Sequence, residues 1–238
     1  MRILAFESSA KAASAAILED GRLLGEYFQN SGQTHSRTLL QMAQDLLKNC
    51  GLAPRDVDAL AVAAGPGSFT GVRIGAAAAK GFAWGLELPC FGVSTLEAMA
   101  WSAGLWEGLA VPAMDARRSQ VYCAAFRMEA GVPARVMEDS AIAVEALGAR
   151  LTELEGPKYL MGDGAALVRS ALDLPDLRLL PEHLRHQRAS GAALAAWRRY
   201  EAGARPGGGA LALRYLRLSQ AERERLERTE REENSQHG

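Results

Sequence analysis

The sequence predicts an α/β fold made of two related lobes, and three observations support it. The apolar strand RILAFE at residues 2–7 ends in an acid, as does GLAVPAMD at residues 108–115. Each is followed by a short loop, two further strands and helices, so a βββαβα unit recurs after about 110 residues. The chain has 238 residues, of which 48% are hydrophobic, enough for one large domain or two small ones.

The first half contains three predicted strands followed by alternating helices and strands. Residues 2–6, 14–20 and 22–28 have the apolar or alternating pattern of strands, and Asp20-Gly21 marks a turn between two of them. Residues 34–51 form an amphipathic helix that ends at a glycine. A strand at 59–65, a helix ending near Trp84, a strand at 88–94 and a helix at 95–104 capped by Ser94 complete this lobe, residues 1–104.

The second half repeats the order and ends in a charged tail. Strands are expected at residues 108–115, 119–128, 134–139 and 158–162, and helices at 144–154, 165–174 and 191–202. A linker at residues 105–109 separates the lobes, and residues 105–219 form the C-terminal lobe. Residues 220–238 are polar with mixed charges, which predicts a solvated, flexible tail.

Charge and cysteine usage point to a cytoplasmic protein without a membrane partner. The formal net charge of −1 gives no reason for general affinity for nucleic acids or acidic membranes. The three cysteines are widely spaced and form no CxxC pair, so reduced thiols are expected. The most apolar long window, residues 72–88, is interrupted by Arg73, Lys80 and Glu87 and is too short and too charged to span a bilayer.

The stretch GPGSFTGVRIG at residues 65–75 is the most unusual motif. As a phosphate-binding loop it is weak, because Pro66 removes one N–H donor and no lysine follows the glycines. The helix that follows contains Gly71, Gly75, Gly81 and Gly85, and each interior glycine costs about 1 kcal/mol relative to alanine. Close approach of another backbone offsets such a cost. The neighbouring backbone belongs either to the helix's own lobe or to another subunit. The sequence does not distinguish these two possibilities.

Acids at strand ends are the second candidate site. Glu7, Ser8 and Ser9 follow the first strand, and Asp115 occupies the matching place in the second half. Paired carboxylates across a cleft would suit metal-assisted phosphoryl transfer. The alternative is that these residues make ordinary turn and cap hydrogen bonds. No glycine follows either acid as a phosphate loop would require, which favours the alternative.

The histidines do not form a metal or nucleophile site. A helical metal site would place a second ligand four residues after His35, where Leu39 stands. His183 and His186 lie in a polar stretch typical of a surface. We therefore predict no catalytic residue and no metal ligand in this chain.

GPGSFTGVRIG, with RILAFESS before it and MDARRSQVY after it, resembles the TsaB (YeaZ) family of subunits in bacterial synthesis of tRNA threonylcarbamoyladenosine. The similarity extends to about residue 217 and includes LPCFGVSTLEA and the late YLR segment. It implies a two-lobed fold of the actin-like ATPase and sugar-kinase (ASKHA) superfamily. It also implies a relationship to the catalytic subunit TsaD, whose first helix carries a His-x-x-x-His metal pair. Leu39 at the second histidine position argues against transferase or glycoprotease activity here.

The resemblance implies a non-catalytic scaffold and activating subunit. It would pair with a TsaD-like subunit, or with a second copy when that subunit is absent, and a TsaE-like P-loop ATPase would join the complex. The complex would modify adenosine 37 in tRNAs that read ANN codons, and tRNA would be met only through the complex. This chain would need no cofactor, since ATP and metal would bind in the partner subunits. The alternative is an active ATP-dependent kinase or a glycoprotease-type metallopeptidase of the same superfamily.

The resemblance also assigns residues to sites. The first two helices, residues 34–48 and 70–84, would provide the partner-binding side chains. These are His35, Leu39, Met42, Gly71, Val72, Gly75, Ala78, Ala79 and Phe82. Glu7, Ser8, Ser9 and Asp115 would be the remains of a nucleotide site.

Overall fold

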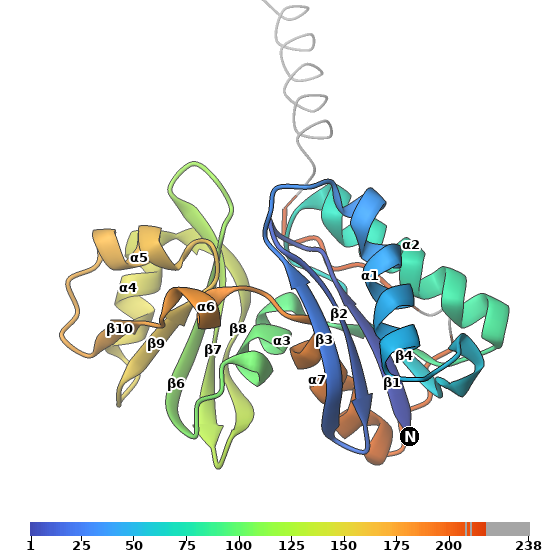
Figure 1. Cartoon of the computed structure of the whole chain (residues 1–238). Coiled ribbons are helices and arrows are strands. Elements are labelled where there is room, and N and C mark those ends of the chain that lie inside the picture. Colours follow the sequence, from blue (N-terminus) through green and yellow to red (C-terminus); the bar gives the residue numbers. More distant parts are fainter. Residues whose placement is uncertain (208, 210, 218–238) are drawn as a thin grey trace, which may run out of the picture.

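The N-terminal lobe is built on a five-stranded sheet with two helices on its outer face (Figure 1). The computed structural model describes residues 1–207, 209 and 211–217. The sheet order is β3-β2-β1-β4-β5, with β4 and β5 parallel to β1. The elements are β1 (Arg2–Glu7), β2 (Ala13–Glu19), β3 (Arg22–Gln29), α1 (His35–Asn49), η1 (Pro54–Asp56), β4 (Ala59–Ala63), α2 (Phe69–Leu86) and β5 (Cys90–Val93).

The second sheet repeats this topology in the same order. Its strands run β10-β9-β6-β7-β8, which is the order of the first sheet read from the opposite edge. The elements are α3 (Thr95–Ser102), β6 (Glu107–Asp115), β7 (Gln120–Glu129), β8 (Val132–Ala143), α4 (Val144–Thr152), β9 (Lys158–Met161), α5 (Ala165–Ala171), β10 (Leu177–Leu179), α6 (Glu182–Arg185) and α7 (Ala189–Glu201). The duplicated, two-lobed α/β fold predicted from the sequence is confirmed.

Helices α1 and α2 cover the outer face of the N-terminal sheet because each carries an apolar stripe. On α1 the buried residues recur every three or four positions, as helical periodicity requires. They are Leu39, Met42, Ala43, Leu46 and Leu47. They pack with β1 and β4 side chains such as Phe6 and Leu60 in one core cluster. Leu86 ends α2, and Glu87 follows it in the left-handed conformation.

Helices α3 and α7 lie between the lobes, and each covers the inner face of the sheet in the other half of the sequence (Figure 1). Alanines of α7 pack on β1 and β4, whereas Leu96 and Met99 of α3 pack with Phe126 and other residues of the C-terminal sheet. The two helices touch closely, since a Cβ on Gly191 would lie 1.9 Å from the carbonyl oxygen of Ala98. The inner faces of both sheets are therefore completed by exchanged helices.

This exchange corrects the predicted domain boundary. Residues 105–219 were expected to form the C-terminal lobe, but α7 belongs to the core of the N-terminal sheet. Leu211 is also buried in the cluster between that sheet and its outer helices. The C-terminal lobe therefore ends before Ala189, and the chain returns to the N-terminal lobe. The predicted tail at residues 220–238 lies outside the described residues.

Candidate partner-binding face and interlobe cleft

The glycines that open α2 pack against the protein's own backbone. A Cβ on Gly71 would lie 2.0 Å from the carbonyl oxygen of Ser8, and one on Gly75 would lie 2.7 Å from Ser8 Oγ. The Ser8 hydroxyl donates a hydrogen bond of 2.8 Å to the Gly71 carbonyl oxygen. These two glycines therefore let α2 approach the loop after β1, which is the intrachain packing that the sequence had left as one of two possibilities.

Three backbone amide groups where α2 begins, those of Ser68, Gly71 and Val72, are engaged by the chain's own oxygens. The Ser68 N–H donates to the Ser9 carbonyl oxygen at 2.7 Å. Ser68 caps α2, accepting the Gly71 N–H on its Oγ at 3.3 Å and the Val72 N–H on its carbonyl oxygen at 2.9 Å. A phosphate-binding loop needs such donors to be free. The motif serves as a helix cap and a close-packing turn.

Most of the predicted partner-binding residues lie inside the core of the chain itself. Leu39 and Val72 are 1% exposed, and Ala79 is fully buried. Gly71 and Gly75 are also buried, and Met42 is nearly so. These residues hold α1 and α2 on their own sheet, so they offer no surface to another subunit.

The remaining predicted residues are half-buried at the edge of this layer. Phe82 stacks at a tilt on Phe6, with ring centroids 5.9 Å apart. His35 Nε2 donates to the Ala10 carbonyl oxygen at 2.7 Å, which ties the first turn of α1 to the loop after β1. For His35, Ala78 and Phe82 the role in binding a partner stays a prediction.

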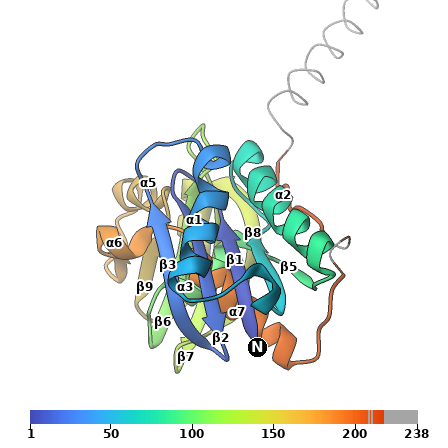
Figure 2. The same ribbon diagram turned by 45° about the vertical axis from the view of Figure 1, so that its right-hand side comes forward.

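The exposed face of this helix pair is formed by other residues (Figure 2). On α2, Ala77, Gly81 and Gly85 are exposed at intervals of four residues, and a Cβ on Gly81 or Gly85 would meet nothing within 4 Å. Trp84 is 88% exposed beside them, and Leu40 of α1 is 46% exposed. We call the four α2 residues among these, Ala77, Gly81, Trp84 and Gly85, the α2 stripe. Their helical spacing was visible in the sequence, but small residues lie on every side of α2 and hide which side faces outward.

A cavity of about 520 Å³ lies between the two lobes. It is lined by the loop after β1, the start of α2, the end of β6 and residues 214–217. Of the residues predicted to form a vestigial nucleotide site, Ser9 and Asp115 line it, whereas Glu7 and Ser8 do not. The structure thus brings together only part of the predicted set.

Glu7 lies beneath the cavity with its carboxyl group fully buried. Its Oε1 accepts the Ser9 N–H at 2.5 Å, and its Oε2 has no hydrogen-bond partner among the described residues. Burial raises the pKa of Glu7 to about 7, which the hydrogen bonds from Ser9 oppose. Asp163 raises this pKa further. A carboxyl group in this position cannot reach a ligand in the cavity.

Asp115 and Asp163 face the cavity from the C-terminal lobe. Asp115 is exposed, and its Oδ1 accepts the Arg117 N–H at 2.7 Å in a tight turn. Asp163 follows β9, and burial raises its pKa, although Gln187 donates a hydrogen bond to it at 3.4 Å. The sequence analysis missed Asp163, although the rule that found Glu7 and Asp115, an acid at the end of a buried strand, applies to it.

The part of the chain that the structure describes contains no cluster of three or more His, Cys, Asp or Glu side chains placed to hold a metal ion. No helix there is both long enough and apolar enough to cross a membrane. The three cysteines are free thiols, and burial raises the pKa of Cys90 to about 11 and that of Cys123 to about 12.

Comparisons with known proteins agree on a role in tRNA threonylcarbamoyladenosine biosynthesis. Residues 25–175 match the family model described as TsaD, tRNA N6-adenosine threonylcarbamoyltransferase. The tRNA threonylcarbamoyladenosine biosynthesis protein TsaB of Bacillus subtilis is 34% identical over 73% of this chain and 76% of its own length. The protein of the same name from Escherichia coli is 39% identical over 69% of this chain and 72% of its own length.

A solved structure supports the same assignment at the level of the fold. YeaZ from Pseudomonas aeruginosa superposes with a TM-score of 0.77 at 27% identity, over 90% of this chain and 99% of that chain. The relatives exceed 30% identity over more than two thirds of their length. The α2 stripe lies within residues 25–175, which match the family model. The chain belongs to the TsaB family of tRNA threonylcarbamoyladenosine biosynthesis proteins.

Proposed function

We propose that this chain is a non-catalytic scaffold subunit that binds a TsaD-like catalytic subunit through the α2 stripe. A TsaE-like ATPase joins the same complex, which threonylcarbamoylates adenosine 37 of tRNAs that read ANN codons. The chain meets tRNA only within this complex, in the cytoplasm. ATP and metal bind in the partner subunits.

The observation that carries the proposal is the unfilled helix face of the α2 stripe. Small residues at intervals of four let a second helix approach closely, and the open space above Gly81 and Gly85 is where it would lie. The exposed Trp84 provides a large apolar anchor next to it, and tryptophan is enriched among residues that dominate binding energy. A close-approach face with an exposed tryptophan favours a protein partner.

The match of this chain to the TsaD family model supports a partner of similar fold. Two subunits of similar fold can pair through equivalent helices about an approximate twofold axis. The same geometry would allow two copies of this chain to pair when the catalytic subunit is absent. Homodimer formation and TsaD binding would then compete for one face.

The cleft supports the non-catalytic part of the proposal. Glu7 is sealed beneath the cavity, and the donors at Ser68 and Gly71 are engaged by the chain itself. An active kinase of this fold needs free backbone donors facing the nucleotide. The chain alone is therefore expected to show no tight binding of ATP with Mg²⁺ by calorimetry. Tight binding would favour the kinase or metallopeptidase alternative.

The proposed partner-binding face is tested by introducing the same bulky, charged side chain, arginine, on each lobe. Ala77→Arg lies in the α2 stripe, and Ala149→Arg lies on an exposed position of α4. Each variant is co-expressed with the TsaD-like subunit of its own organism, purified through a tag on this chain and sized by light scattering. The expected result is that Ala77→Arg loses the partner and the homodimer, and Ala149→Arg keeps both. Retention of the partner by a folded Ala77→Arg variant would contradict the proposal.

A further inference from the structure

The last described segment, residues 211–217, crosses from one lobe to the other. In the N-terminal lobe, the Arg214 N–H donates to the Ala64 carbonyl oxygen at 2.7 Å. In the C-terminal lobe, the Arg217 guanidinium donates to the Ala116 carbonyl oxygen at 2.7 Å. These two bonds join the ends of β4 and β6 across the cavity. The segment also lines the cavity, so it closes part of its mouth.

The segment is anchored firmly on the N-terminal lobe. Leu211 is 6% exposed within the core cluster of that lobe. Tyr215 stacks on Phe69 with ring centroids 4.9 Å apart, and its hydroxyl accepts a 3.0 Å hydrogen bond from Arg73 Nε. Arg73 in turn lies 3.6 Å above the Phe69 ring. The segment therefore moves with this lobe.

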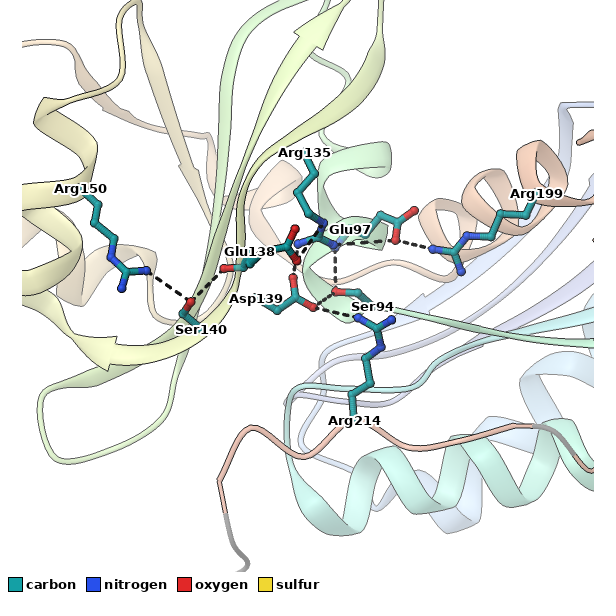
Figure 3. Close-up of polar contacts among 9 residues, drawn as sticks. All are labelled: Ser94, Glu97, Arg135, Glu138, Asp139, Ser140, Arg150, Arg199 and Arg214. Atoms are coloured by element: carbon teal, nitrogen blue, oxygen red, sulfur yellow. Dashed lines mark hydrogen bonds and ion pairs between the residues drawn. The ribbon is translucent and has the colours of Figure 1, made fainter.

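Beneath the segment, Asp139 of β8 receives partners from both lobes (Figure 3). Its Oδ2 accepts the Ser94 hydroxyl at 2.6 Å and lies 3.8 Å from the Arg214 guanidinium, both from the N-terminal side. Its Oδ1 accepts from Arg135 on its own strand. The Asp139 side chain is 7% exposed, so its charge depends on these partners for stabilisation.

Glu97 at the start of α3 forms a second centre beside the first (Figure 3). Its Oε2 accepts a 2.5 Å hydrogen bond from Arg199 of α7 and lies 4.0 Å from Arg135 of β8. Ser94 caps α3 by accepting the Glu97 N–H at 3.3 Å while it donates to Asp139. The two carboxylates thus share Arg135 and couple α3, α7 and β8 into one network.

We propose that residues 211–217 and the network centred on Asp139 and Glu97 form an interlobe clasp that fixes the angle between the lobes. Two-lobed enzymes bind ligands by closing a hinge, and domains joined by a modest interface move by default. Here opening the cleft breaks the Asp139 and Arg217 contacts together, in addition to the packing of α3 on α7. The chain then acts as one rigid body, and its cleft does not cycle between open and closed forms.

The clasp is tested by measuring the distance between the lobes in the full-length chain without partners. Spin labels are placed at Arg55→Cys and Ala149→Cys, exposed positions on opposite lobes, in a Cys50→Ser background. The two other cysteines are buried. Double electron–electron resonance is recorded after dilution with unlabelled protein, so that distances between copies do not contribute. One narrow distance distribution is expected for the parent chain.

Asp139→Asn is compared with Glu138→Gln, which makes the same chemical change on the neighbouring residue. The Glu138 side chain is 85% exposed and lies 4.0 Å from Arg135. Asp139→Asn is expected to broaden the distribution or shift it to longer distances, and Glu138→Gln to leave it unchanged. Arg214→Ala, whose side chain is 60% exposed, tests the same contact with little risk to folding.

A broad distribution in the parent chain would overturn the proposal. An unchanged, narrow distribution in folded Asp139→Asn would also overturn it. If Asp139→Asn does not fold, an unchanged, narrow distribution in Arg214→Ala would overturn it instead. Circular dichroism establishes which variants are folded. Because no partner is present, the outcome does not depend on whether the chain binds a TsaD-like subunit.

Discussion

The outer helices of the two lobes occupy equivalent places in a duplicated unit, but they differ in length and in what they expose. Helices α1 and α2 have 15 and 18 residues, whereas α4 and α5 have 9 and 7. All four cover a sheet of the same strand order. Covering such a sheet thus needs only short helices. The additional turns of α2 carry Gly81, Trp84 and Gly85, which are exposed and belong to the proposed binding face.

The acids at the ends of β1 and β6 differ in the same way. Glu7 is fully buried and bonded to its own loop, whereas Asp115 is exposed and closes a turn. Of these two equivalent positions, only Asp115 therefore lines the interlobe cavity. The difference between the lobes can be tested by matched substitutions at equivalent or neighbouring places.

The largest effect is expected from Gly71→Ala, compared with Gly148→Ala on α4. The new methyl group at position 71 would meet a backbone oxygen at 2.0 Å, which costs on the order of 4 kcal/mol in the free energy of unfolding. At position 148 it would meet side-chain carbons of Leu172 at 2.7 Å, which can turn aside at a cost of about 1 kcal/mol. Urea denaturation measures both. Equal losses would show that α2 packs no more tightly than α4.

Glu7→Gln is expected to stabilise the protein at high pH. The folded-state pKa of Glu7 is raised from 4.5 to about 7, so the folded state favours the protonated carboxyl group. The resulting stability is present below pH 4.5 and is lost as the pH rises through 7. At pH 8 the neutral glutamine avoids this loss, a gain of roughly 3 kcal/mol that disappears at pH 4.

Thermal denaturation at pH 4 and pH 8 measures this effect. Asp115→Asn is the control, because it makes the same change at the equivalent, exposed position. Its stability is expected to stay within about 0.5 kcal/mol of the parent at both pH values. A Glu7→Gln variant whose stability follows the parent at every pH would contradict the burial of that charge.

Trp84→Ala is expected to weaken binding of the TsaD-like subunit by about 2 kcal/mol, or roughly 30-fold, as loss of a tryptophan anchor does. The side chain is 88% exposed, so the free energy of unfolding should change little. Leu167→Ala on α5, where the side chain is 36% exposed, serves as the control on the other lobe and should not affect binding. Titration calorimetry with the purified partner gives both affinities. Equal affinities of the two variants would contradict the proposal that the partner binds the N-terminal lobe through Trp84.

The smallest effect is expected from Gly81→Ala, which should stabilise the isolated chain by about 1 kcal/mol. A Cβ at this position meets nothing within 4 Å, so alanine gains helix propensity without a clash. The same substitution thus has opposite signs at Gly71 and Gly81 of one helix. Urea denaturation of the two variants side by side checks this. A loss of stability at position 81 would mean that this face is not open in the free protein.

Much of the fold follows from local signals in the sequence. The helix at residues 34–51 was predicted from its apolar spacing and is present as His35–Asn49. The cap at Ser94 was expected, and its side chain accepts the Glu97 N–H. Both features depend on residues close together in the chain. The duplicated order of strands could be predicted for the same reason, because each unit carries its own turns and strand ends.

The features that could not be predicted depend on contacts between distant residues. The alanine-rich α7 carries no signal of which sheet it would cover, so it was assigned to the wrong lobe. In α2, small residues occur on every side, and periodicity alone did not separate the inward Gly71 from the outward Gly81. Strand β10 and helix α6 have only 3 and 4 residues, too few to show a period.

The position of α7 also determines the order in which the protein can be completed during synthesis. The inner face of the N-terminal sheet, which includes Ile3 and Ala61, is covered by residues 189–201. A ribosome delivers these residues only after the whole C-terminal lobe has been made. The lobe that is made first is therefore finished last, and until then its sheet presents an apolar surface. Duplication produced two similar units, but the exchange of one helix in each direction made them a single unit of folding.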